Sequence, residues 1–220
     1  MTTAQEVLDQ AHAALAETDR QIRNHPYLAE IRAGTVTLEA LRSFPGHQYH
    51  LWRSDLRSTA TMVQRFGDLP YGDFFINDLQ AEVAAREQIL VLAAKLGMSE
   101  ADLEAFEPTP DGFAYTAYFA WLSMYGSAAE VACGVAVNFA AWGHNCGEVS
   151  KGLKEHYSVT EDEARFLDDF ANLPSFDSAA AVIIEDDLKK GVEPRVIVRA
   201  ARLIQAYEQS FWDAMLAATR

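Results

Sequence analysis

Hydrophobic residues recur at three- and four-residue spacing along almost the whole chain, and alternating β-branched runs between hairpin turns are missing. This pattern predicts an all-α protein. Turn and capping residues separate the predicted helices. The predicted helices cover about residues 3–22, 38–66, 73–96, a short segment beginning at 99, and then 113–125, 128–156, 160–172, 176–190 and 193–215.

Local signals define several of these helix ends. Pro45 is expected to kink the helix over 38–66, because proline removes a backbone donor inside a helix. Gly97 is the kind of residue that ends a helix in the left-handed conformation. Ser99 with Asp102 has capping-box spacing, and the Pro-rich segment 108–112 is expected to end the short helix that follows. Thr160 with Glu163 repeats that capping signature.

The segment 128–156 is unusually rich in alanine and glycine, which let neighbouring helices approach closely. We therefore expect this helix to be central and buried. No Ser-, Gly- or Pro-rich stretch divides the chain, so residues 1–220 are predicted to form a single-domain helical bundle.

Charge excludes some partners. The chain has 18 Lys and Arg against 32 Asp and Glu, a net charge of −14. Such a negative field repels phosphate backbones and anionic lipids, so we expect neither a nucleic-acid nor a membrane partner. The first residues lack the basic and apolar regions of a signal peptide, and no apolar run is long enough to span a bilayer, which predicts a cytoplasmic protein.

No self-contained motif names a reaction: phosphate-binding glycine loops, serine nucleophile elbows, zinc-binding His-Glu-x-x-His and Cys-x-x-Cys pairs are absent. A di-metal site in a helical bundle needs Glu-x-x-His pairs, and none occurs. We therefore predict no metal and no cofactor. The acidic stretches 162–169 and 185–187 are expected to be solvated helix faces.

The two cysteines, Cys133 and Cys146, fall on the same predicted helix, roughly 20 Å apart at its rise per residue. They are too far apart for an intrachain disulfide. A free cysteine on an apolar helix usually behaves as a small buried hydrophobe.

Four sequence blocks stand out: His25-Pro26-Tyr27-Leu28 with Gly34-Thr35, the segment from Met98 to Pro110 followed by Tyr115-Thr116, Ala129-Glu130-Val131, and Tyr207 to Asp213. In their order and nearly in their spacing, these blocks resemble the TenA (thiaminase II) family, whose all-α fold is similar to that of haem oxygenase. The resemblance implies this fold and a dimer or tetramer.

At some positions where the resemblance implies a site residue, this chain has the family's residue type, and at others it has a different one. The catalytic glutamate on the last helix falls on Glu208, and one tyrosine that contacts the substrate ring falls on Tyr115. The nucleophilic cysteine position falls on Asn138, and an expected aspartate and tyrosine fall on Gln48 and Leu51. Asparagine offers no thiolate and glutamine no carboxylate, so thiaminase chemistry is not expected with this alignment.

Further candidates come from helix geometry. Trp142 and Cys146 follow Asn138 at four-residue steps, so all three share one stripe that could line a cavity. Phe211 lies one turn from Glu208, a carboxyl that is costly to bury and is expected to hold its proton tightly. The candidate set has Glu208 as the catalytic residue and Tyr115, Asn138, Gln48, Trp142, Phe211, His47 and Cys146 as ligand-binding residues.

Two functions stay open. In the first, the protein binds a small aromatic or heterocyclic ligand in a buried helical pocket and hydrolyses an aminopyrimidine of thiamin salvage, with Glu208 as acid and base. In the second, a TenA-like protein without the nucleophile binds another ligand or performs an oxidase-type reaction. Whether the chain is an enzyme is left undecided, and the expected partners are a small molecule and further copies of the chain.

Overall fold

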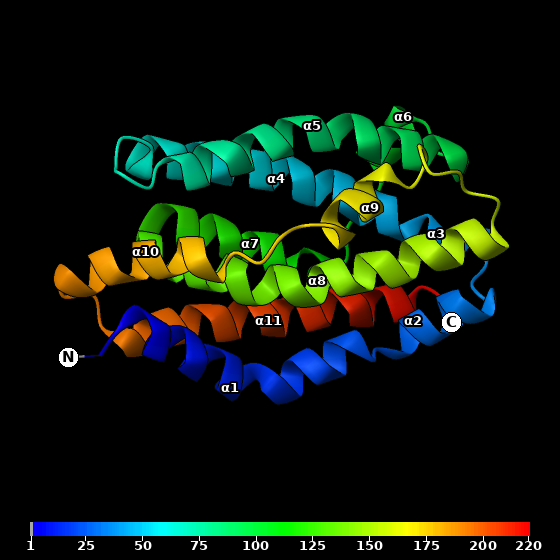
Figure 1. Ribbon diagram of the computed structural model, residues 1–220. Helices are drawn as coiled ribbons and strands as arrows, with labels where there is room; N and C mark the ends of the chain where they lie inside the picture. Colours follow the sequence, from blue (N-terminus) through cyan, green and yellow to red (C-terminus); the bar gives the residue numbers. More distant parts are fainter. Residues whose placement is uncertain (1) are drawn as a thin grey trace.

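The computed structural model describes residues 2–220, which form eleven α-helices and no β-strand (Figure 1). The all-α prediction is confirmed. The helices are α1 Ala4–Arg23, α2 Pro26–Ala33, α3 Leu38–Leu41, α4 Ser43–Phe66, α5 Asp73–Lys95, α6 Glu100–Ala105, α7 Pro110–Tyr125, α8 Ala128–His156, α9 Arg165–Ala171, α10 Asp177–Lys189 and α11 Pro194–Ala217.

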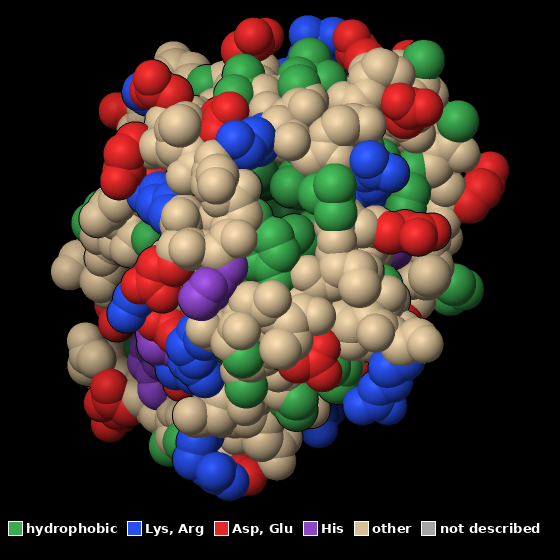
Figure 2. Space-filling model, turned by 90° about the vertical axis from the view of Figure 1, so that its right-hand side faces the viewer, with side chains coloured by type: hydrophobic (Ala, Val, Ile, Leu, Met, Phe, Trp, Pro, Cys, Tyr) green, Lys and Arg blue, Asp and Glu red, His purple; other side chains and the backbone are tan. Residues whose placement is uncertain are grey.

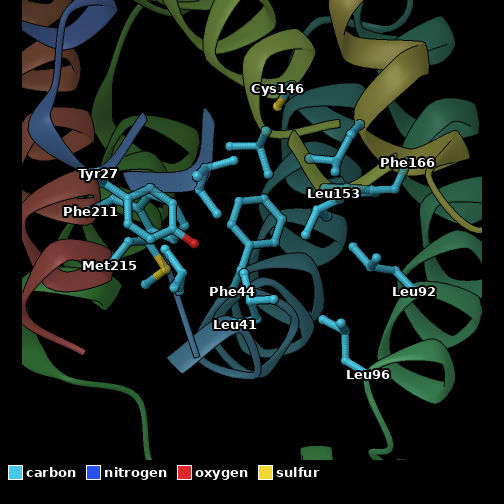
Figure 3. Packing of buried hydrophobic residues seen from close by; sticks show 14 of the residues in the cluster. Tyr27, Leu41, Phe44, Leu92, Leu96, Cys146, Leu153, Phe166, Phe211 and Met215 are labelled. Atoms are coloured by element: carbon cyan, nitrogen blue, oxygen red, sulfur yellow. The ribbon is translucent and has the colours of Figure 1, made fainter. Parts of the chain in front are cut away.

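The long helices run roughly parallel or antiparallel, with α8 and α11 packed together in the middle of the bundle (Figure 1). Helices α1 and α7 also pack on α11, while α9 and α10 pack on α8. Helices α4 and α5 form a hairpin that joins the bundle through α7. Buried apolar side chains from α2, α4, α5, α8, α9 and α11 meet around Phe44 (Figure 3).

Helix α8 is buried along most of its length, as its small residues predict. A Cβ atom added at Gly143 would lie 2.6 Å from the carbonyl oxygen of Phe170, and one at Gly152 would lie 2.9 Å from that of Ile31. Glycine at these positions therefore allows α9 and α2 to pack against the α8 backbone.

The structure corrects several helix boundaries. The helix predicted over 38–66 is two helices, α3 and α4, which meet at Arg42. The interruption lies within one turn before Pro45, which has no N–H to donate to the carbonyl of Leu41, so the distortion expected at Pro45 takes the form of a break between α3 and α4. Helix α7 begins at Pro110, capped by Thr109, rather than at 113. Residues 26–33, which lie outside the predicted helices, form α2.

Other local signals are confirmed. Gly97 has φ +75° after the end of α5, and Ser99 and Asp102 form a reciprocal capping box. Thr160 and Glu163 also exchange backbone-to-side-chain hydrogen bonds, although α9 begins only at Arg165.

One acidic stretch is not a solvated face as expected. Asp187 is only 5% exposed and accepts a hydrogen bond from the backbone nitrogen of Ala129 at 2.9 Å. It therefore caps the start of α8, where a negative charge favours the helix dipole. In the other stretch, Asp168 accepts hydrogen bonds from Ser150 and Lys154.

The molecular surface in Figure 2 carries acidic and basic side chains interspersed over the end of the bundle. Among the helices of residues 2–220, none combines the length and the apolar character needed to cross a membrane. Cys133 and Cys146 are both buried free thiols, as predicted.

Candidate functional site

A cavity of about 760 Å³ lies between the α4–α5 hairpin and helices α7 to α11. Its wall is mainly apolar and strongly aromatic, with Trp52, Tyr115, Trp142, Phe166 and Phe211 among the lining residues. Concave, mostly apolar sites with a few polar groups are the usual form of small-molecule sites. The polar groups in this wall therefore identify the candidate chemistry.

Glu208 is the most buried carboxyl in the cavity wall, at 2% exposed. Its position on α11 faces α8, where Asn138 donates a hydrogen bond from Nδ2 to Oε2 of Glu208. Trp212, one turn further along α11, donates from Nε1 to Oε1 at 3.0 Å. Asn138 Nδ2 also lies 3.0 Å from Oε1 of Gln205, so the amide links two side chains of α11.

Burial raises the pKa of Glu208 to about 8, and the hydrogen bond from Trp212 only partly opposes this rise. The cause is the loss of water around a charged carboxylate, which favours the protonated form. At pH 7 Glu208 is therefore a neutral carboxylic acid that can donate a proton. A group with a pKa near the working pH is suited to general acid and base chemistry.

Trp142 and Phe211 form an aromatic wall beside Glu208. Their ring centroids are 5.5 Å apart with planes at 71°, and Trp142 lies 5.2 Å from the ring of Trp212. Edge-to-face contacts of this kind hold aromatic rings in defined orientations. The wall therefore offers a flat ligand a rigid aromatic surface.

Tyr115 and Gln48 supply polar groups from two other helices. Tyr115, on α7, stacks on Phe119 with centroids 5.9 Å apart, and burial raises the pKa of its hydroxyl well above the ordinary value. Gln48, on α4, is 6% exposed, and its Nε2 has no hydrogen-bond partner in the protein. Leu51, one turn beyond Gln48, also lines the cavity.

Sequence reasoning missed three further carboxyls in the wall: Asp55 on α4, and Asp78 and Glu82 on α5. Burial raises the pKa of Asp55 to about 7 and that of Asp78 to about 6, and burial together with the other two charges raises the pKa of Glu82. Asp55 lies seven residues after Gln48 and therefore on the same face of the helix. This spacing could have identified Asp55 from the sequence as a residue of the cavity wall.

The structure places two candidates elsewhere. His47 packs between α4 and the start of α7, with Nδ1 2.8 Å from the carbonyl oxygen of Ser43 and Nε2 3.1 Å from Oγ1 of Thr109. Cys146 belongs to the apolar cluster around Phe44 (Figure 3). Neither is among the cavity-lining residues, whereas Glu208, Tyr115, Asn138, Gln48, Trp142 and Phe211 are.

The cysteines are unsuited to nucleophilic chemistry. Burial raises the pKa of Cys133 to about 12 and that of Cys146 well above its ordinary value. Both are therefore neutral thiols at physiological pH, and the thiolate is the nucleophilic form. Within residues 2–220, His, Cys, Asp and Glu side chains do not gather in any group of three or more suited to a metal ion.

Solved structures share this fold at low sequence identity. A TenA homologue from Pseudomonas syringae pv. tomato matches 95% of this chain and 92% of its own, with 14% identity and a TM-score of 0.77. A TenA homologue from P. horikoshii matches 96% and 99%, with 16% identity and a TM-score of 0.77. A domain of unknown function with a heme oxygenase-like fold, from Shewanella denitrificans, matches 96% and 91%, with 17% identity and a TM-score of 0.72.

No functionally curated protein matches the chain. The sequence profile of the TENA/THI-4/PQQC family, in contrast, matches residues 12–218, which span α1 to α11 and include every residue of the cavity wall. The chain therefore belongs to the TENA/THI-4/PQQC family.

Proposed function

We propose that this protein binds a small aromatic heterocycle in this cavity and hydrolyses it through Glu208, without a cysteine nucleophile. The observation that carries the proposal is Glu208 itself, a carboxyl with a pKa of about 8 in an aromatic cavity wall. The ligand class that fits best is the aminopyrimidine, a flat ring with hydrogen-bonding nitrogens, which the family resemblance also favours.

The hydrolysis needs proton transfer in two directions. Protonated Glu208 gives its proton to the leaving amine, so the carbon–nitrogen bond breaks without releasing an amide anion. The resulting carboxylate takes a proton from the water that attacks the same carbon, and a carbon–oxygen bond forms. Glu208 returns to its protonated form. Asn138 holds the carboxyl in place, and Tyr115 and Gln48 orient the ring or the water.

Asn138 supports a mechanism without a covalent intermediate. Its Nδ2 reaches both Gln205 and Glu208, so this helix face offers an amide where the family resemblance implies a thiol. The nearest thiol along this helix stripe, Cys146, is two turns away in the apolar cluster around Phe44.

A second candidate function is binding of a different heterocycle with no hydrolysis. It is favoured by the combination of Gln48, Leu51 and Asn138 in the wall, because these residues remove the carboxylate and the nucleophile that the family resemblance implies. This candidate uses the same cavity and the same aromatic wall.

Thermal-shift measurements and turnover assays with aminopyrimidines, thiamin and related heterocycles test the proposal. A ligand that binds only the folded protein raises its melting temperature. We expect an aminopyrimidine to stabilise the wild type and to be hydrolysed by it. Stabilisation without turnover would support the second candidate, and no stabilisation by any of these heterocycles would contradict the proposal.

A further inference from the structure

A second groove, of about 520 Å³, runs along the seam between α4 and α7. We call it the α4–α7 groove. Its α4 side includes Arg53 and Arg57, whereas the cavity that contains Glu208 is lined by Leu51 and Asp55 of the same helix. At 3.6 residues per turn these two sets of side chains point in roughly opposite directions. Helix α4 therefore separates the groove from the cavity described above.

The α4–α7 groove is basic although the chain as a whole has a net charge of −14. Its charged lining residues are Arg53 and Arg57, and within residues 2–220 no Asp or Glu lines it. The two arginines are four residues apart, so they are neighbours on one face of the helix. Like charges at this spacing destabilise a helix. An anion bound beside both guanidinium groups would remove that repulsion.

Neither arginine is neutralised by a carboxylate of the protein itself. More than half of the Lys and Arg side chains form an ion pair, but in the described part of the chain Arg53 and Arg57 have no carboxylate oxygen within 4.0 Å. Arg53 lies over the ring of Tyr49, with its Cζ atom 5.7 Å from the ring centroid. This cation–π contact orients the guanidinium group and leaves its N–H donors available.

Three hydroxyl groups of the groove are already used within their own helices. Ser58 and Thr61 each donate to the backbone oxygen one turn earlier in α4, at 3.0 and 2.9 Å. Ser123 donates to the backbone oxygen of Ala120 in α7 at 2.8 Å. The charged donors for a ligand are therefore the two guanidinium groups, whose planar N–H pairs match the oxygens of a carboxylate, sulfonate or phosphate.

Helix α7 supplies an uncharged, apolar side to the groove. From Gly112 to Tyr125 the helix contains no charged residue. Phe113 and Met124 line the groove, and Met124 is 57% exposed. An exposed apolar surface beside two unpaired guanidinium groups matches a ligand with one apolar and one anionic part.

Hydrogen bonds between elements close the groove at both ends. Beyond one end, Arg65 of α4 donates to the backbone oxygen of Gly126, just after α7, at 2.7 Å. At the other end, Nε2 of His50 donates to the backbone oxygen of Leu103 in α6 at 2.9 Å. The α4 side between these ends is about 16 Å long at the rise of an α-helix. A closed groove of this length favours a small molecule over a protein segment, which would have to cross the bridges.

We propose that the α4–α7 groove binds a small organic anion, with its carboxylate, sulfonate or phosphate held by Arg53 and Arg57 and its apolar part against Phe113 and Met124. Pairing of the anion with the guanidinium groups and burial of the apolar part both favour binding. The site is separate from the cavity that contains Glu208, so this inference stands independently of the proposed function.

Two fluorescent probes with the same rings test the inference: 8-anilinonaphthalene-1-sulfonate, and N-phenyl-1-naphthylamine, which lacks the sulfonate. Fluorescence titration at pH 7 measures the affinity of each probe for the wild type, Arg53→Gln and Arg57→Gln. We expect each substitution to lower the affinity of the sulfonate about fivefold or more and to leave that of the neutral probe unchanged. Addition of about 0.5 M NaCl should also weaken sulfonate binding to the wild type.

The matched control is Arg202→Gln, which removes an exposed arginine of α11 outside the groove. It changes the net charge by the same amount and should leave the affinity of the sulfonate intact. Equal sulfonate binding by the wild type and both groove variants would overturn the inference, and so would an equal loss of both probes, which would indicate an apolar surface without an anion site. Sedimentation velocity supplies the last comparison. If the groove variants change only the association state of the protein, the groove is an interface between copies of the chain and the inference fails.

Discussion

Glu208 and Asn138 illustrate how one side chain changes the chemistry available to its neighbour. The Asn138 amide donates to the Glu208 carboxyl, and Trp212 donates to its other oxygen, so the carboxyl is held in one orientation. Burial nevertheless keeps its pKa at about 8. The pair is therefore an oriented acid with an adjacent amide, and the nucleophile of a covalent mechanism is missing from it.

The burial of the two cysteines determines how reactive their thiols are. Cys133 and Cys146 are fully buried, and burial raises the pKa of both. We expect a disulfide reagent such as Ellman's reagent to react with neither thiol of the native protein at pH 8 and with both after unfolding in guanidinium. Rapid reaction of one thiol in the native protein would show an accessible cysteine and would reopen nucleophilic catalysis.

At the scale of helices, the contact between α8 and α9 positions part of the aromatic wall. Gly143 of α8 lies against the backbone of Phe170 in α9, and Phe170 itself lines the cavity. Four residues further along α8, Gly147 faces Ala171 with more room, since an added Cβ would be 3.4 Å from the Cβ of Ala171. The two glycines form a matched pair.

Alanine at these two positions should have opposite effects. Gly143→Ala forces α9 away from α8, and overpacking of this kind lowers the free energy of unfolding by about 1–3 kcal/mol. Gly147→Ala makes an ordinary contact, and the higher helix propensity of alanine should raise stability by up to about 1 kcal/mol. Urea unfolding followed by circular dichroism measures both. Equal effects of the two substitutions would contradict the packing described for α8 and α9.

The helices also show which structural features could be predicted from the sequence and which could not. Helix periodicity, capping pairs and Gly97 are local signals, and they located most helix ends correctly. Pro45 was a local signal of the same kind, because the helix predicted over 38–66 breaks at Arg42, three residues before the proline. The cavity-wall carboxyls Asp55, Asp78 and Glu82 were missed because the contact between α4 and α5 that brings them to one cavity is tertiary.

Over the whole molecule, a net charge of −14 coexists with carboxyls buried in the cavity wall. Asp55, Asp78 and Glu208 have pKa values of about 7, 6 and 8 in the folded protein, above their ordinary values near 4. Between about pH 4 and pH 8 these carboxyls hold protons in the folded protein that they have already released in the unfolded chain. The stability of the folded protein therefore falls as pH rises from about 4 to about 8.

We expect the free energy of unfolding to be at least about 2 kcal/mol lower at pH 8.5 than at pH 5. Glu208 should account for most of this change, because Asp55 and Asp78 keep partial exposure to the cavity. Denaturant unfolding of wild type and Glu208→Gln across this range measures it. The variant should show a flatter pH dependence, and parallel curves would contradict the raised pKa of Glu208.

The most direct test of the central claim compares wild type and Glu208→Gln for aminopyrimidine binding and hydrolysis at pH 7. Glutamine resembles a protonated carboxyl in shape and hydrogen bonding but transfers no proton. The account predicts that both proteins bind the ligand with similar affinity and that the variant loses roughly 100-fold or more in kcat. Equal turnover by the two proteins, or no binding by the wild type, would contradict it.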